Sequence, residues 1–350
     1  MKASKPIVAA GLMALAVMLA GCSLDTPEQE PDGQMSLTEE EAVLLDAAEG
    51  EGKLVWYSVL PPDSVEKTVA AFEDRYQGIT IEALRLSSGP MATRYSQERA
   101  SGLNPADVLT ISSPAFFVDA QSQGWVHTEL DLPALEAWPS EYYDRGLVTT
   151  GLLPLLIGYN TDQIQVADAL DTWEAVLDEK WKGGINLGDP RTVPAYLALA
   201  ELWYQEYGPE FLTELAALEP NIVSSIVPGS QELAAGGAQL MVPDSYTVLA
   251  PLIAENAPVA ANVPAPTTGV EYQTALAINS PSPNAAKLFV NFLLTEQGQI
   301  VTNAGGGTSV LGDISDDLTP LPEGYRALGP LLRDAYAHED ELLALLGIAG

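Results

Sequence analysis

Cysteine and histidine are almost absent from this chain of 350 residues. Cys22 is the single cysteine, so neither an internal disulfide nor a cluster of thiolate metal ligands can form. The only histidines are His127 and His338, and neither lies near the end of an expected strand. These counts exclude a metal site that depends on several histidines.

Basic residues are also scarce. The chain has 15 Lys and Arg residues against 48 Asp and Glu residues, which gives a formal net charge of −33. Such a charge argues against binding to nucleic acid and against lying flat on an anionic membrane. It favours solubility, agrees with a salty habitat, and is the ordinary property of a solvated acidic surface.

Motifs for catalysis are missing as well. The sequence contains no nucleophile elbow, no phosphate-cradling loop and no zinc-protease helix. Nucleophilic hydrolysis needs a base beside a serine, but His127 follows Gly124-Trp125-Val126 and His338 lies in an acidic C-terminal stretch. We therefore expect no enzyme, and an exported hydrolase is the alternative that these absences disfavour.

The first 22 residues have the composition of an export signal. Lys2 and Lys5 precede the apolar run 7–20, and Leu19-Ala20-Gly21 leads directly to Cys22. A charged start, a short apolar stretch and small residues before a cleavage site are typical of a signal peptide rather than a membrane span. A cysteine in this position resembles the bacterial lipobox, whose cysteine receives diacylglycerol. Residues 1–21 are thus predicted to be a lipoprotein signal peptide, with an ordinary cleaved signal or an uncleaved anchor as alternatives.

A polar segment follows the cysteine. Residues 23–41 are rich in Ser, Thr, Pro, Gly, Asp, Glu and Gln, and their only large apolar residues are Leu24, Met35 and Leu37. Such a segment cannot bury enough apolar surface to fold alone. Residues 22–48 are therefore predicted to be a flexible tether.

Apolar runs and amphipathic stretches alternate from residue 53 onward. Expected strands are 53–57, 79–84, 106–111, 152–159, 184–187, 238–242 and 274–278. Expected helices are 64–76 after a cap at Asp63, 91–100, one opened by Pro114, 193–207, 209–218, 285–294 after a cap at Asn284, and one capped by Thr295. The early βαβαβα order predicts a parallel sheet covered by helices.

The interruption of this order predicts two lobes. The chain is expected to leave the first lobe near residue 150 and to return near residue 270. This gives lobe 1 as 49–150 plus 270–310 and lobe 2 as 151–269. Residues 311–350 are predicted to be a C-terminal helical segment that packs on the lobes.

Five segments, in order from Gly52 to about Gly307, resemble a known family: the extracellular solute-binding proteins of ABC importers, in their ferric-iron-type branch. The segments are Gly52-Lys53-Leu54-Val55-Trp56-Tyr57-Ser58, Asn104-Pro105-Ala106-Asp107-Val108, Ile157-Gly158-Tyr159-Asn160-Thr161, Thr172-Trp173-Glu174 with Lys180-Trp181-Lys182-Gly183 and Asp189-Pro190-Arg191-Thr192, and Pro283 to Val290 with Thr295-Glu296-Gln297-Gly298-Gln299.

The resemblance implies an α/β fold of the periplasmic-binding-protein type II, in which two lobes joined by crossover strands close on a ligand like a clamp. It implies ABC permease and ATPase subunits as partners, and a small-molecule or ion ligand. With the lipid anchor, the expected location is the extracytoplasmic face of the cell membrane, and we expect a monomer. A tethered sensor that reports to a signalling partner would use the same clamp and is the alternative.

The ligand is expected beyond the carboxyl ends of the strands, where helix N-termini offer free N–H groups. The candidate ligand-binding residues in these loops are Ser58, Ser87, Ser88, Ser112, Ser113, Arg191, Thr192, Ser230, Asp244, Ser245 and Tyr246. Hydroxyl and backbone donors there, with a bidentate arginine, favour a small organic or phosphorylated anion. The simpler alternatives are serines that only cap helices and an Arg191 in a surface ion pair.

Ferric iron is the second ligand hypothesis. Ferric members of the family hold iron with an adjacent pair of tyrosines, often aided by a histidine in the first loop. Here the pair's place has Ser245-Tyr246, and the first loop has Leu60-Pro61-Pro62. Tyr246 with Tyr57 and Glu98 could still hold iron beside a bound anion. No cofactor is expected other than iron as the transported ligand, and Tyr142-Tyr143 is interpreted as an aromatic patch on an interdomain loop.

Overall fold

The computed structural model describes residues 37–164 and 170–348. The predicted signal peptide 1–21, Cys22 and residues 23–36 lie outside these ranges, so the predictions made for them stay predictions. No helix in the described ranges is both long enough and apolar enough to cross a membrane.

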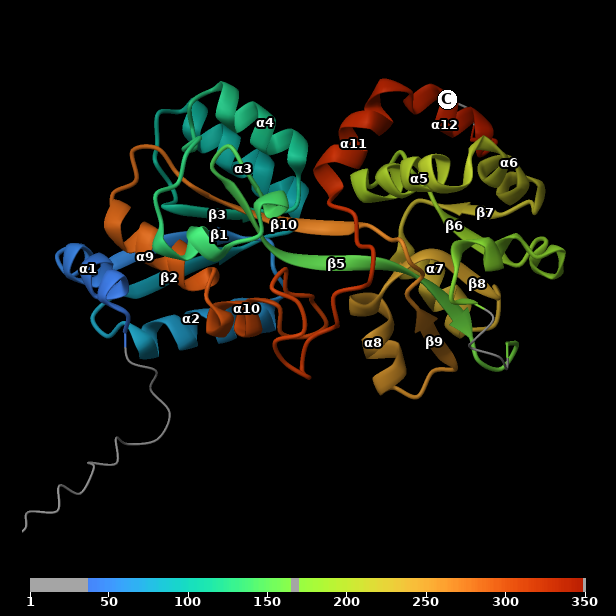
Figure 1. Cartoon of the computed structure of the whole chain (residues 1–350), viewed down its shortest axis with the longest axis horizontal. Helices are drawn as coiled ribbons and strands as arrows, with labels where there is room; N and C mark the ends of the chain where they lie inside the picture. Colours follow the sequence, from blue (N-terminus) through green and yellow to red (C-terminus); the bar gives the residue numbers. More distant parts are fainter. Residues whose placement is uncertain (1–36, 165–169, 349–350) are drawn as a thin grey trace, which may run out of the picture. The chain divides into compact units, whose positions relative to one another are not determined.

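One mixed sheet of ten strands runs through the molecule (Figure 1). Its main path is β2 (Thr80–Arg85), β1 (Lys53–Ser58), β3 (Val108–Ile111), β10 (Gly269–Leu276), β5 (Leu147–Asn160), β8 (Leu240–Ser245), β6 (Ile185–Gly188) and β7 (Asn221–Val223), while β4 (Tyr143–Asp144) and β9 (Val259–Asn262) pair with β5. Strands β2, β1 and β3 are mutually parallel, as are β7, β6 and β8. Two parallel blocks therefore flank the antiparallel strands β10 and β5.

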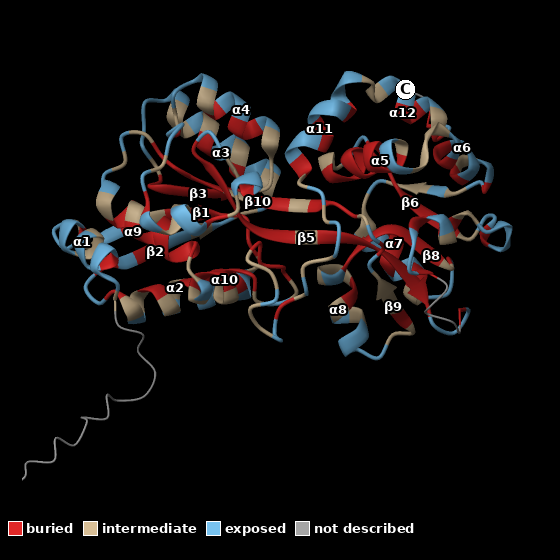
Figure 2. Ribbon diagram, viewed as in Figure 1, coloured by how far each residue is buried: buried red, intermediate tan, exposed pale blue. Residues whose placement is uncertain are grey.

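Strand β5 belongs to both halves of the sheet. Its first part pairs with β10, where Leu153 faces Val270, and its last part pairs with β9, where Asn160 faces Val259. All but one of its 14 residues are buried, and it appears as a continuous red band in Figure 2. Strands β5 and β10 thus make the crossover connection that the order of the elements predicts.

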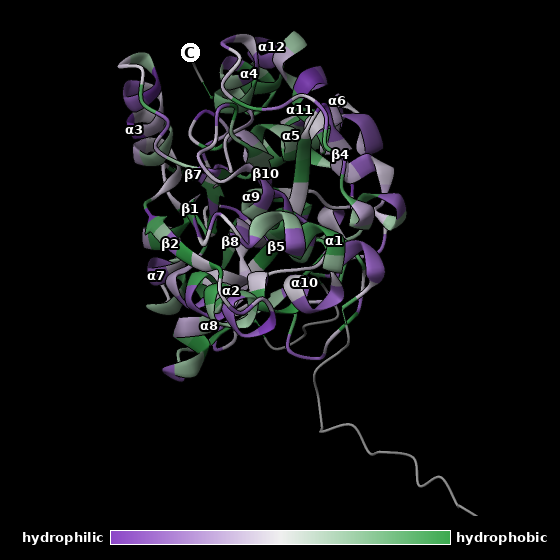
Figure 3. Cartoon of the chain, turned by 90° about the vertical axis from the view of Figure 1, so that its left-hand side faces the viewer, coloured by the Kyte–Doolittle hydropathy of each residue, from purple (hydrophilic) through white to green (hydrophobic). Residues whose placement is uncertain are grey.

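Six helices cover the first parallel block, which we call lobe 1. They are α1 (Glu39–Ala48), α2 (Pro62–Arg75), α3 (Ser88–Ala100), α4 (Pro114–Ser122), α9 (Pro283–Leu293) and α10 (Glu296–Thr302). In the core Phe289 of α9 lies 5.0 Å from Trp56 and 5.1 Å from Phe72, measured between ring centroids. The helices of this lobe carry both hydrophilic and hydrophobic residues, as expected where one face of a helix packs on a core (Figure 3).

The second block, lobe 2, carries α5 (Pro194–Tyr207), α6 (Pro209–Ala217), α7 (Ile226–Ala234), α8 (Tyr246–Ala254), α11 (Leu328–Ala337) and α12 (Glu339–Leu345). Short 3-10 helices lie at Pro133–Ala137, Ser140–Tyr142, Trp173–Leu177 and Glu179–Trp181. Helix α11 packs on α5, and its Leu331, Leu332 and Ala335 join the core of lobe 2. The C-terminal segment is therefore part of this lobe's core.

The predicted tether is wrong over its last ten residues, because residues 39–48 form α1. Thr38 and Glu41 make a capping box at the start of this helix. Glu41 is buried and accepts hydrogen bonds from Arg75 at 2.8 Å and from the Tyr76 hydroxyl at 2.7 Å. Leu44 and Leu45 of this helix pack on the core of lobe 1, so the tether was predicted beyond the polar residues that support it.

Most predicted strands and helices are present with shifted ends, and two predicted caps differ. Helix α2 begins at Pro62 with Pro61 at its N-cap, so Asp63 lies inside the first turn. Helix α9 is preceded by Ser282, while Asn284 bonds instead to Glu51 through its side-chain nitrogen at 2.8 Å. The cap at Thr295 is confirmed, since its hydroxyl accepts the Gly298 N–H at 3.1 Å.

Candidate functional site

A cavity of about 320 Å³ lies where the N-termini of α3, α4 and α5 meet. Helices α3 and α4 belong to lobe 1 and α5 to lobe 2, so both lobes contribute to its walls. It is lined by Ser88, Gly89, Ser112, Ser113, Pro114, Thr192, Val193, Pro194, Ala195, Val270 and Leu328. Four of the predicted ligand-binding residues, Ser88, Ser112, Ser113 and Thr192, are therefore brought together here.

Each of the three helices begins just after a strand, which explains why their N-termini converge. Helix α3 follows β2, α4 follows β3 and α5 follows β6. The first N–H groups of a helix have no partner within it and carry partial positive charge. Pro114 and Pro194 occupy the first turn of α4 and α5, where a missing N–H costs nothing. In α3 the first donors are the N–H groups of Ser88 and Gly89.

The hydroxyl groups at the cavity differ in whether they already make hydrogen bonds within the protein. Ser113 caps α4 by accepting the Phe116 N–H at 3.4 Å, and the Thr192 hydroxyl donates to the Asp189 carbonyl at 2.8 Å. The Ser88 Oγ is buried and has no hydrogen-bond partner among the described residues. A buried hydroxyl without a partner is costly, so Ser88 is the side chain most in need of a ligand.

Arg191 does not reach into this cavity. Its Nε lies 2.9 Å from Asp189 Oδ1, and a terminal nitrogen lies 2.8 Å from Oδ2. The hydrogen bond from Arg191 holds the pKa of the Asp189 carboxyl below its ordinary value. This ion pair agrees with the alternative given for Arg191, and a ligand contact by Arg191 stays a prediction.

Three further predicted residues are buried and do not line the cavity, so a ligand contact by them stays a prediction. Ser58 is fully buried in β1 and accepts the Leu60 N–H at 3.2 Å. The Ser230 hydroxyl lies 2.8 Å from Asp244 Oδ2, and both residues are fully buried. Burial raises the pKa of Asp244 to about 7. Ser58 therefore bonds within its own loop, while Ser230 of α7 bonds to Asp244 of β8.

The remaining predicted residues lie at helix starts outside the lining of the cavity. Ser87 is the exposed N-cap of α3, and its side chain makes no capping bond. Ser245 is the N-cap of α8, and its Oγ lies 2.9 Å from Thr247 Oγ1. Tyr246 opens α8, is 42% exposed, and lies close to Gly306. A ligand contact by these three residues stays a prediction.

The three residues predicted for iron lie in two different places. The Tyr57 hydroxyl donates to Glu98 at 3.0 Å beneath α3, and burial followed by this bond raises the pKa of Tyr57. Tyr246 lies instead beside Gly306, in the loop after α10. Helix α10 packs on α2. Both helices lie below the strands in Figure 1, whereas α3 lies above them. The structure thus corrects the predicted set, which does not form one site. The described part of the chain also has no group of three His, Cys, Asp or Glu residues placed to hold a metal.

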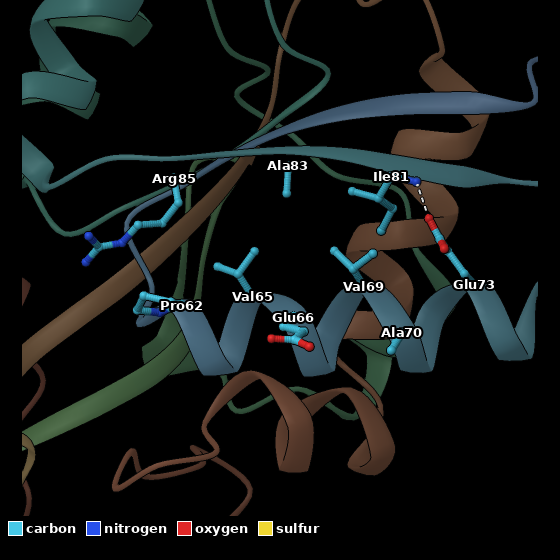
Figure 4. Close-up of a pocket in the computed structure, with 9 residues that line it drawn as sticks. All are labelled: Pro62, Val65, Glu66, Val69, Ala70, Glu73, Ile81, Ala83 and Arg85. Atoms are coloured by element: carbon cyan, nitrogen blue, oxygen red, sulfur yellow. Dashed lines mark hydrogen bonds between the residues drawn. The ribbon is translucent and has the colours of Figure 1, made fainter.

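Sequence reasoning did not find the apolar part of the cavity wall, which comes from Val193, Pro194 and Ala195, with Val270 and Leu328. Pro194 at the start of α5 was the available signal. It also missed a groove of about 490 Å³ between α2 and the edge strand β2 (Figure 4). Val65, Val69 and Ile81 line this groove, and Glu73 accepts the Ile81 N–H at 2.8 Å. Its walls are mainly apolar.

The chain belongs to a known family. Residues 59–300, more than half of its length, match the family described as bacterial extracellular solute-binding protein. No curated protein sequence matches the chain.

Several solved structures are similar to it. Iron-bound HitA from Pseudomonas aeruginosa has a TM-score of 0.63 and 18% identity over 83% of this chain and 99% of that one. The apo ferric ion-binding protein A from Pasteurella haemolytica has a TM-score of 0.65 and 16% identity over 85% and 99%. AfuA from Actinobacillus pleuropneumoniae, with exogenous fructose-6-phosphate bound, has a TM-score of 0.59 and 19% identity over 85% and 97%. At these identities the likeness shows the fold alone.

The predicted family and fold class are therefore confirmed: the chain has the two-lobed α/β fold of periplasmic binding proteins with crossover strands. It is a solute-binding protein of the ABC-transporter type, in a family of transport proteins and not of enzymes. Membership places it on the extracytoplasmic side and implies permease and ATPase partners and a small ligand.

Proposed function

We propose that this protein binds a small organic or phosphorylated anion in the cavity between α3, α4 and α5 and delivers it to an ABC importer. The observation that carries the proposal is the Ser88 Oγ, which is buried without a partner at the point where three helix N-termini converge. Ligands of the size of a sugar phosphate fit a cavity of about 320 Å³.

The local donors outweigh the acidic charge of the whole protein. A net charge of −33 repels anions at long range, but salt screens this repulsion beyond about 8 Å at physiological ionic strength. Each helix N-terminus stabilises a nearby anion by about 1 kcal/mol, or up to about 2 kcal/mol where it is partly buried. Three of them together with free hydroxyl and N–H donors therefore favour an anion at this point.

The chemistry of the cavity supports an anion better than directly coordinated iron. None of the described residues that line it carries a carboxylate, an imidazole or a phenol, which are the side chains that hold ferric iron. HitA was solved with iron and AfuA with fructose-6-phosphate, so this fold accommodates either kind of ligand and does not choose between them. The choice then depends on the donors in the cavity.

A titration of the purified protein tests the proposal. Tryptophan fluorescence and calorimetry would be recorded with fructose-6-phosphate, a phosphonate, ferric citrate, thiamine and a polyamine. We expect a phosphorylated or carboxylated anion to bind, and Ser88→Ala to weaken it by about 1–2 kcal/mol. Ser101→Ala is the matched control, because Ser101 lies at the other end of α3 and its hydroxyl is exposed. Equal affinities for both variants would contradict the site.

We further propose that Cys22 carries the lipid anchor that keeps the protein beside its permease. The support is the position of the only cysteine directly after Leu19-Ala20-Gly21. Cys22→Ser is expected to move the protein from the membrane fraction to the soluble fraction. Metabolic labelling with a fatty acid that leaves the wild-type protein unlabelled would refute the anchor.

A further inference from the structure

A second cavity, of about 680 Å³, lies between α4 and α11. Helix α4 belongs to lobe 1, whereas α11 packs on α5 in lobe 2. Val118, Leu147 and Leu332 supply apolar wall, and β10 supplies Glu271 and Gln273. Among the described lining residues only Pro114 is shared with the anion cavity, so this is a separate site.

Two side chains of β10 at this cavity, Glu271 and Gln273, have hydrogen-bond acceptor oxygens that the described residues do not use fully. Glu271 is 6% exposed; its Oε1 accepts the Leu328 N–H at 2.7 Å, and its Oε2 accepts the Thr149 hydroxyl at 3.2 Å. A carboxylate accepts about four hydrogen bonds, so about two positions remain open. The Oε1 of Gln273 is also buried and has no partner in the described part of the chain. The hydroxyl of Tyr142 is a further polar group at the wall.

A ligand that satisfies these acceptors must bring several N–H donors and an apolar body. A primary ammonium group has three N–H donors and a positive charge that matches the carboxylate. We propose that the cavity is a second binding site, which takes a small organic molecule with a primary ammonium group held between Glu271 and Gln273. The acidic surface of the protein raises the local concentration of such cations.

Capping of α11 alone does not account for the arrangement. Leu328 is the first residue of α11, and a carboxylate at a helix N-terminus is stabilising. This role uses one oxygen of Glu271, however, and leaves the buried Gln273 Oε1 without a donor. The ion pair of Asp144 and Arg145, with Glu141 and Arg333, places charges of both signs among the other lining residues. The buried carboxylate therefore decides which charge the cavity accepts.

The ionisation of Glu271 gives the site a pH dependence. Burial raises the pKa of Glu271 to about 7, and an ammonium ion beside it favours the ionised form. Tyr142 and Tyr325 stay protonated, because burial raises the pKa of Tyr142 to about 12 and that of Tyr325 well above its ordinary value. Among the neighbours, Glu141, Asp144, Arg145 and Arg333 also line the cavity. Binding is thus expected to tighten as the pH rises through about 7.

Calorimetry with 2-phenylethylammonium chloride, in about 0.15 M salt to suppress surface binding, tests the site. The N,N,N-trimethyl derivative is the control ligand, because it keeps the charge and the apolar body but has no N–H donor. We expect one saturable site for the primary ammonium and at least about tenfold weaker binding of the trimethyl compound. No saturable binding, or equal binding of both compounds, would overturn the proposal.

Three variants of the full chain sharpen this test. Glu271→Gln is expected to weaken binding about thirtyfold and Gln273→Met about fivefold, since a charged and a neutral acceptor are lost. Glu214→Gln removes the same charge from the exposed surface of α6 and should change nothing. If Glu271→Gln fails to fold, Gln273→Met alone tests the site, because it leaves the cap of α11 intact. If all three variants bind like the wild type, the ligand is not in this cavity.

Discussion

Asp244→Asn is the substitution whose effect follows most directly from the geometry. Asp244 is fully buried; its carboxylate accepts the Ser230 hydroxyl at 2.8 Å and the Ser245 N–H at 2.7 Å. Burial is the largest influence on it and raises its pKa from 3.8 to about 7 in spite of these two bonds. In the unfolded chain the same carboxyl ionises at its ordinary pKa.

The sign of the pH effect follows from this difference. Below pH 3.8 both states hold the proton and the group contributes its full stability. Between pH 3.8 and about 7 the unfolded state loses the proton while the folded state keeps it, so stability falls as the pH rises. A shift of roughly three units at about 1.4 kcal/mol per unit makes this loss about 4 kcal/mol.

The carboxamide of the Asp244→Asn variant cannot titrate, so this loss disappears. At pH 4 the variant is expected to be about 1 kcal/mol less stable than the wild type, because the amide replaces one acceptor oxygen. At pH 8 it should be about 3 kcal/mol more stable. Urea unfolding of both proteins from pH 4 to pH 8 measures the difference, with exposed Asp119→Asn as the control. Parallel stability curves would refute the reasoning, and loss of anion binding would show that Asp244 is a ligand contact after all.

Two further predictions concern α1 and the ligand. Glu41→Ala removes the carboxylate that Arg75 and Tyr76 share. It should lower the free energy of unfolding in urea by about 3 kcal/mol and expose α1 to protease. The control Glu40→Ala, at an exposed position, should do neither. Tyr246→Phe separates the two ligand hypotheses. If the protein binds iron through phenolate, the wild type is coloured and the variant is colourless. If it binds an anion, we expect a colourless wild type, and the variant loses about 1–2 kcal/mol of binding free energy if the hydroxyl donates to the anion. A coloured, iron-loaded protein purified without added metal would contradict the anion.

The layout of the fold could be predicted because each element carries its own signal. Pro114 and Pro194 mark helix starts, and apolar runs mark the buried strands. The crossover was predictable too, because an apolar strand returned late in the sequence after an interrupted order. The polar run ends at Glu41, whereas Leu44 and Leu45 pack on the core of lobe 1, so the tether was predicted too far along the chain.

The candidate site was predictable only as a set of loops. Ser58 and Ser88 both follow apolar runs, but the first is the last residue of a buried strand and the second lies in the first turn of a helix. Whether a serine lies in the strand or in the following helix depends on where the strand ends, to within one or two residues. The sequence does not determine this position. The sequence also left open whether Arg191 contacts a ligand or an acidic neighbour, and the local turn places it beside Asp189.

The most direct test of the anion site is to place a negative charge inside it. Gly89 lines the cavity, and a Cβ added there meets no atom within 4 Å. Gly89→Asp should keep or raise stability, because an acidic residue in the first turn favours the helix. It should also abolish anion binding, since two like charges about 4 Å apart cost about 4 kcal/mol near a protein surface. Gly50→Asp is the control, at another position where an added Cβ meets no atom within 4 Å. A folded Gly89→Asp protein that binds the anion as tightly as Gly50→Asp would contradict the account.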